Sequence, residues 1–130
     1  MTVTLGVVLA ALAGLDGVPL PILVGLGGSV GALSRYAVDV VLGGGRRSTF
    51  AVNVLGSVAL GALVASSPQA TALDVAGTGF CGAFTTFSSF AVNVAEAASK
   101  GDVRLAAVDA AGTLASALLG VALGTVLVGV

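Results

Sequence analysis

The sequence predicts an all-α membrane protein whose chain crosses the bilayer four times. Of its 130 residues, 57% are hydrophobic and 8% are charged, and the mean hydropathy is +1.15. A soluble domain carries about 25% charged residues, so this chain has too few polar side chains to cover a surface in water. Its charged residues are separated by long apolar stretches, and four of these are close to the roughly 20 residues that a spanning helix needs.

Composition also excludes several function classes. A single cysteine cannot form a disulfide framework or a cysteine-rich zinc site. Five basic residues and a net charge of −1 argue against a nucleic-acid partner. The scarcity of polar side chains argues against a soluble enzyme, and we expect the lipid bilayer to be the protein's surroundings.

The four spans are expected at residues 20–42, 49–65, 71–98 and 105–130, so that residues 19–130 form one four-helix unit. Residues 1–18 form an apolar extension with a core of about 13 residues, which reaches roughly 20 Å as a helix and is too short to span. We interpret it as an interfacial segment; a signal sequence and a misassigned start codon are the alternatives.

The basic residues predict an orientation. Arg46 and Arg47 are expected between the first and second spans, and Lys100 and Arg104 between the third and fourth. The opposite side, with both termini, carries no Lys or Arg. Because basic loops stay in the cytoplasm, both termini are predicted to lie outside.

Small residues predict close helix packing. Gly25, Gly28 and Ala32 are expected on one face of the first span, and Gly56 and Gly61 lie in the second. Such residues let helix backbones approach each other in lipid. Four thin helices enclose little volume, so a polar pathway is expected to need an oligomer.

The third span contains the most unusual segment, GFCGAFTTFSSF at residues 79–90. Its glycines and hydroxyl residues weaken a helix, so the segment predicts a break at mid-membrane. A break releases backbone carbonyls, which need a partner within the protein, in water or on an ion such as Na⁺.

Polar and aromatic groups near this break suit a small anion. Phe87 and Phe90 share a helical face, and the positive edges of their rings can face an anion. The hydroxyls of Ser88, Ser89 and Thr86 and the amide of Asn53 can donate hydrogen bonds to the same path. The alternatives are core packing for the phenylalanines and a helix-to-helix bond for the asparagine.

Three blocks resemble the CrcB/Fluc fluoride channel family: GGSVGALSRY at 27–36, TFAVNVLGS at 49–57 and the segment at 79–90. The resemblance implies an antiparallel, dual-topology dimer of four-helix subunits in a prokaryotic plasma membrane, with two pores that passively export fluoride. It implies fluoride-pore roles for Asn53, Phe87, Phe90, Thr49, Ser88 and Ser89, and a structural Na⁺ at the dimer interface on the backbone carbonyls of Gly82 and Thr85. Arg35 matches a vestibule arginine, although a helix-end anchor is an equal alternative.

The sequence departs from the family pattern at several positions. Ala83 replaces a glycine, and Asn93 stands where members usually have a glutamate. In the fourth span, Thr113 and Ser116 are the candidates for the family's polar track, and an ionised Asp109 in the path would repel an anion.

Several functional hypotheses remain open. A conducting homodimer needs insertion in both orientations, whereas the charge bias favours a heterodimer with an inverted paralogue. A non-conducting structural subunit and a small proton-coupled multidrug exporter are the further alternatives. The exporter needs a deep carboxylate, whereas Glu96, Asp102 and Asp109 all lie around the loop between the third and fourth spans.

Overall fold

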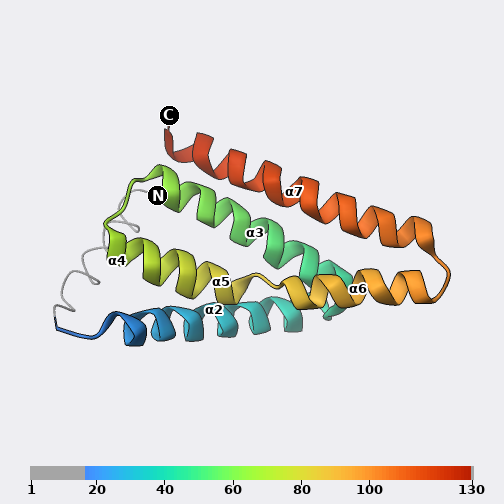
Figure 1. The fold of residues 1–130 in the computed structure, drawn as a ribbon, viewed down its shortest axis with the longest axis horizontal. Helices are drawn as coiled ribbons and strands as arrows, with labels where there is room; N and C mark the ends of the chain where they lie inside the picture. Colours follow the sequence, from blue (N-terminus) through green and yellow to red (C-terminus); the bar gives the residue numbers. More distant parts are fainter. Residues whose placement is uncertain (1–16, 130) are drawn as a thin grey trace.

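The computed structural model describes residues 17–129, which are helical outside the turns (Figure 1). The predicted extension at 1–18 lies outside this range except for its last two residues. The helices are α2 (Leu20–Leu42), α3 (Gly45–Ala65), α4 (Ala70–Ala72), the π-helical η1 (Leu73–Cys81), α5 (Gly82–Phe84), α6 (Phe87–Ser99) and α7 (Val103–Gly129). Segments α4 to α6 follow one another along a single rod, so the described chain has four rods (Figure 1).

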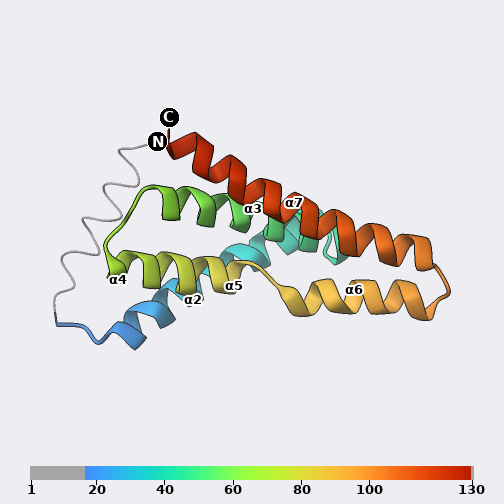
Figure 2. The same ribbon diagram turned by 45° about the horizontal axis from the view of Figure 1, so that its top comes forward.

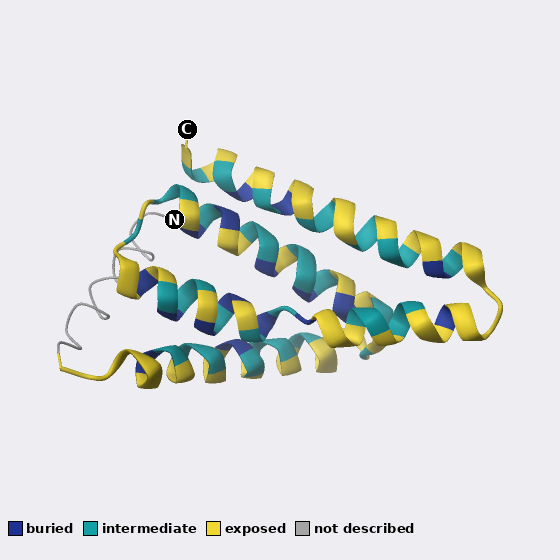
Figure 3. Cartoon of the chain, viewed as in Figure 1, coloured by how far each residue is buried: buried dark blue, intermediate teal, exposed yellow. Residues whose placement is uncertain are grey.

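Three of these rods are long and apolar enough to cross a membrane: Gly45–Ala65, Ala70–Ser99 and Val103–Gly129. Helix α2 has 23 residues, a length of about 35 Å against a hydrocarbon core of about 30 Å, but it carries Arg35 and Asp39. The outward faces of the rods are largely exposed and apolar, as expected for helices that contact lipid (Figure 3).

The connection between α2 and α3 is shorter than the sequence predicts. Gly43, Gly44 and Gly45 have φ values of 76°, 70° and 70°, a left-handed conformation that glycine adopts without strain. They reverse the chain at once, and α3 begins at Gly45. The prediction that Arg46 and Arg47 lie in a loop is therefore wrong, because both belong to the first turn of α3.

The rods pack in two main pairs, α2 with the rod of α4 to α6 and α3 with α7. Helix α2 lies against η1 and α5, while α7 lies against α3 and α6 (Figures 1 and 2). The turn between α6 and α7 lies at the same end of the molecule as the connection between α2 and α3 (Figure 1). This arrangement brings the start of α3, the end of α6 and the start of α7 together.

Glycines form the closest contacts in both pairs. On α2, a Cβ at Gly27 or Gly31 would collide with backbone carbonyls of η1, whereas Gly25 has open space. The predicted contact face is therefore wrong for Gly25 but not for Gly28, at which an added Cβ would lie 3.7 Å from the Gly79 carbonyl of η1. Gly56 and Gly61 of α3 do make close contacts, with Thr85 and with the backbone of α7 respectively.

Candidate functional site

The site is built around an interruption between α5 and α6. Helix α5 ends at Phe84 and α6 begins at Phe87, and the two residues between them are extended. Thr85 has φ −79° and ψ 164°, and Thr86 has φ −148° and ψ 116°. Backbone groups at this point leave the helical hydrogen-bond ladder and need other partners.

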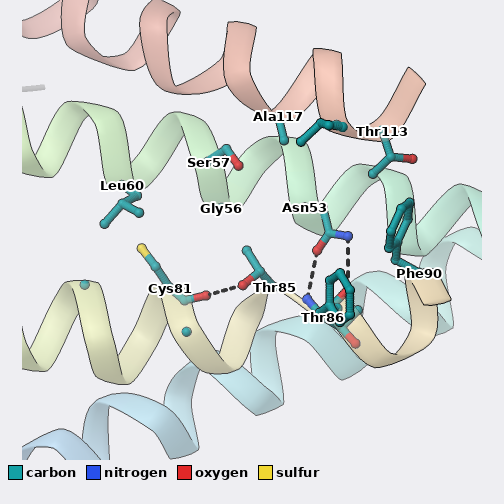
Figure 4. A pocket seen from close by; sticks show the side chains of 14 residues that line it. Asn53, Gly56, Ser57, Leu60, Cys81, Thr85, Thr86, Phe90, Thr113 and Ala117 are labelled. Atoms are coloured by element: carbon teal, nitrogen blue, oxygen red, sulfur yellow. Dashed lines mark hydrogen bonds between the residues drawn. The ribbon is translucent and has the colours of Figure 1, made fainter. Parts of the chain in front are cut away.

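Asn53 of α3 provides two of these partners (Figure 4). The Thr86 N–H donates to Asn53 Oδ1 at 2.8 Å, and Asn53 Nδ2 donates to the Thr86 carbonyl at 3.1 Å. The pairing fixes the orientation of the amide, because only its oxygen can accept and only its nitrogen can donate. One Nδ2 hydrogen is not used in this pairing, and Asn53 also lines the adjacent cavity.

Thr86 also caps the start of α6, and its hydroxyl is hydrogen-bonded to the hydroxyls of Ser88 and Ser89. The Ser89 N–H donates to Thr86 Oγ1 at 3.2 Å, and Thr86 Oγ1 donates to Ser89 Oγ at 3.1 Å. Because Thr86 has one hydroxyl hydrogen, Ser88 must be the donor in its 3.2 Å contact with Thr86 Oγ1. The Ser89 hydroxyl hydrogen is left free to donate elsewhere, and both serines are exposed.

Arg35 also reaches the interruption. Its Nη1 donates to the Thr85 carbonyl at a long 3.4 Å, and the residue is partly buried. The Thr85 hydroxyl donates to the Cys81 carbonyl at 2.9 Å. The sequence left a vestibule and a helix-end anchor open for Arg35; neither interpretation included this contact.

The carbonyl of Gly82 is released by the same interruption. In an unbroken α-helix it would accept from the Thr86 N–H, which instead donates to Asn53. Among the described residues, no backbone N–H outside a regular helix donates to the Gly82 carbonyl. Gly82 is exposed and Thr85 is half-buried, so by donor type their carbonyls fit a hard cation such as Na⁺.

The two phenylalanines of interest lie together at the start of α6. The ring centroids of Phe87 and Phe90 are 5.7 Å apart, with an angle of 49° between the ring planes. Phe87 is 79% exposed, although it is a large apolar side chain beside a polar break. A second pair, Phe80 and Phe84, stacks within the packed rods at 5.6 Å.

A cavity of about 360 Å³ lies against the interruption, between α3, α7 and the rod formed by α4 to α6 (Figure 4). It brings together six of the predicted residues: Asn53, Gly82, Thr85, Phe87, Phe90 and Thr113. Apolar side chains make up much of its wall, with Leu60 and Ala117 among them (Figure 4).

A second cavity of about 210 Å³ lies next to the first. It shares Phe90 and Thr113 with the first cavity and adds the buried Thr49. Ser116 lines neither cavity, so the structure does not bring it to the candidate site. The polar residues of α7 that face this line of cavities are Asp109 and Thr113, four residues apart and thus on one face.

Sequence reasoning missed two parts of the site. It treated Thr86 only as one more hydroxyl, although its backbone is the centre of the Asn53 bonds. It also left Asp109 without a partner, whereas Asp109 Oδ2 lies 2.5 Å from Arg46 Nε. The available signal was that both charges lie near the ends of their spans on the same side of the membrane.

Comparison with known proteins identifies the family. The model of a family described as "CrcB-like protein, Camphor Resistance (CrcB)" matches residues 22–125, which include every predicted site residue. The fluoride-specific ion channel FluC 2 of Natronomonas pharaonis is 46% identical over 104 residues, covering 80% of this chain and 90% of that protein. FluC 2 of Haloarcula marismortui is 44% identical over 106 residues, covering 78% and 87%.

A third relative extends the match further along the chain. FluC 1 of Halobacterium salinarum is 40% identical over 112 residues, which are 85% of this chain and 94% of that protein. These relatives are named as ion channels and not as enzymes. The family model and these relatives each match most of the chain, which is built from helical rods. The chain therefore belongs to the CrcB/FluC family of membrane ion channels.

Proposed function

We propose that this chain is a subunit of a fluoride-selective passive channel that exports F⁻ from the cytoplasm. The observation that carries the proposal is the Asn53–Thr86 clamp, which lies beside Phe87 and Phe90 on a cavity within a chain of this family. In this proposal F⁻ passes the ring edges and the hydrogen-bond donors around the interruption, and no step consumes an energy source.

The donors around the interruption suit fluoride. Fluoride is small and strongly hydrated, so a path must replace its water with close donors. The unused Nδ2 hydrogen of Asn53 and the free hydroxyl hydrogen of Ser89 are two such donors. The edges of Phe87 and Phe90 add positive partial charge without adding a charge that would trap the ion.

The exposure of the site supports an inverted partner subunit. Polar backbone at membrane depth is tolerated only against protein or water, yet Gly82, Ser88, Ser89 and Phe87 are all exposed in the single subunit. A second subunit would cover them and complete the path. The basic bias toward one end favours a heterodimer with an inverted paralogue, and a homodimer inserted both ways is the alternative.

A structural Na⁺ belongs to the same proposal. The carbonyls of Gly82 and Thr85 would hold it together with their counterparts in the second subunit. Its charge would offset the dipole of the Gly82 carbonyl, which the interruption releases from its helical N–H partner. Arg35, which already donates to the Thr85 carbonyl, adds positive charge near the same place and would attract the anion.

The test replaces one ring and measures fluoride efflux. The channel, purified from its own membranes with any accompanying subunit, is placed in liposomes and read with a fluoride electrode. Phe87→Ile removes a ring edge at the candidate path, and we expect fluoride efflux to fall about tenfold or more, a loss of about 1.4 kcal/mol of stabilisation of the passing ion.

Phe80→Ile is the matched control, because Phe80 lines neither cavity at the interruption. Its efflux is expected to equal that of the unchanged protein. Equal efflux from both variants would contradict the assignment of Phe87 and would favour a non-conducting structural subunit.

A further inference from the structure

An ion pair joins α3 to α7 at the end where α6 turns into α7. Arg46 Nε lies 2.5 Å from Asp109 Oδ2, and Arg46 Nη2 donates to the Asn93 carbonyl at 3.1 Å. The two side chains are 38% and 20% exposed. This cluster therefore ties together the first turn of α3, the middle of α6 and the second turn of α7.

The cluster stands between two cavities. Arg46 and Asn93 line both the cavity of about 210 Å³, which contains Thr49, and one of about 430 Å³. The larger cavity is also lined by Glu96, Lys100 and Asp102 at the α6–α7 turn. An ion that moved from the interruption past Phe90 toward this end would meet the cluster before it reached the turn.

We propose that the Arg46–Asp109 pair is a charge gate at this end of the ion path, in which Arg46 binds the passing anion and Asp109 limits the strength of that binding. The inference rests on the proposed function, since it assigns a specificity-determining pair to the same path. It concerns residues outside the interruption and outside its aromatic pair.

The guanidinium has the donors for this role. Arginine carries five N–H groups, and the bond to the Asn93 carbonyl and the contact with Asp109 use only part of them. The others can face an anion in either cavity, because the side chain lines both. Arg46 can thus exchange partners between the Asp109 carboxylate and a fluoride ion.

The carboxylate has an equally defined role. Conduction requires binding that is favourable enough for entry and weak enough for release. A lone Arg46 would hold fluoride too long, and a lone Asp109 would repel it. The pair places one positive and one negative charge beside the shared wall of the two cavities, so that the anion is attracted by a cation already partly neutralised.

The experiment measures fluoride binding and flux in four proteins: the unchanged channel, Asp109→Asn, Arg46→Gln and the double variant. Binding is followed by ¹⁹F NMR titration of the purified channel in detergent, and flux by efflux from liposomes over a range of fluoride concentrations. Arg47→Gln is the matched control, since it removes a basic charge from the same turn of α3 at an exposed residue that lines none of the three cavities.

We expect Asp109→Asn to bind fluoride several-fold more tightly and to lower its maximal flux, because release becomes slow. Arg46→Gln should weaken binding and reduce flux about tenfold, because the remaining carboxylate is unpaired. The double variant should recover much of the flux of the unchanged channel, while its half-saturating fluoride concentration rises. Arg47→Gln should change none of these quantities by more than a small factor.

Other outcomes overturn the proposal in distinguishable ways. If fluoride binding is the same in all four proteins while the variants unfold at lower temperature, the pair is only a structural clamp between α3 and α7. If the unchanged channel carries no fluoride, the proposed function fails together with the gate. If it carries fluoride and Asp109→Asn leaves binding and flux unchanged, the gate alone is wrong.

Discussion

At the scale of single residues, Asn53 solves the main difficulty of a helix interruption in a membrane. Its amide satisfies both backbone groups of Thr86, which would otherwise lie unpaired in an apolar environment. The same bond releases the carbonyl of Gly82 from its helical partner. One side chain therefore stabilises the interruption and also creates the polar surface on which the proposed function depends.

Replacing this amide should cost stability. Asn53→Leu keeps the approximate size but leaves the Thr86 N–H and carbonyl unpaired, and we expect the free energy of unfolding to fall by about 2–4 kcal/mol. The measurement is a denaturant unfolding titration of the purified channel in mixed micelles. Asn93→Leu serves as the control, because the described hydrogen bonds of Asn93 involve its backbone carbonyl only. Similar losses in both variants would show that the amide bonds do not stabilise the interruption.

The sequence predicted this residue and its neighbours only in part. A polar amide in the middle of an apolar span and the clustered hydroxyls of residues 85–89 indicated hydrogen-bond donors for an anion near the predicted break. Which backbone group Asn53 contacts depends on the rotation and depth of two helices, and no local pattern reports either quantity. For the same reason, the pairing of Arg46 with Asp109 emerged only from the packed structure.

At the scale of helices, glycine contacts decide how close the rods come. On α7, Gly120 and Gly124 lie one turn apart and both face carbonyls of α3. Composition predicted tight packing, but not that Gly27 and Gly31 of α2 would make it instead of Gly25. A pattern of small residues does not show which of several nearby glycines makes the contact, because that depends on the partner helix. Here the partner is η1, and its π-helical winding changes which of its residues face α2.

A pair of glycines in α7 tests this account. At Gly124 an added Cβ would collide with the Val58 carbonyl and lie 2.7 Å from the Ala62 nitrogen, whereas at Gly112 it would meet nothing within 4 Å. Gly124→Ala should therefore lower the free energy of unfolding by about 1–3 kcal/mol, since α3 and α7 must move apart. Gly112→Ala should be neutral or slightly stabilising. Unfolding titrations that ranked the two variants in the opposite order would show that the α3–α7 contact is not close.

At the scale of the whole molecule, a line of cavities runs from the interruption to the α6–α7 turn. Each cavity shares residues with the next: Phe90 and Thr113 join the first two, and Arg46 and Asn93 join the last two. The line lies along α3, α6 and α7, while the exposed Phe87 marks the surface that a second subunit would cover. Four helices and their order follow from hydropathy, but this line depends on how they pack.

The central claim is that the interruption between α5 and α6, together with the neighbouring cavities, forms a path that conducts fluoride and excludes chloride. The most direct measurement loads liposomes that contain the channel, purified with any accompanying subunit, with equal concentrations of fluoride and chloride and records both ions with electrodes. The account predicts rapid loss of fluoride and retention of chloride. Loss of both ions at similar rates, or retention of both by correctly folded protein, would contradict it.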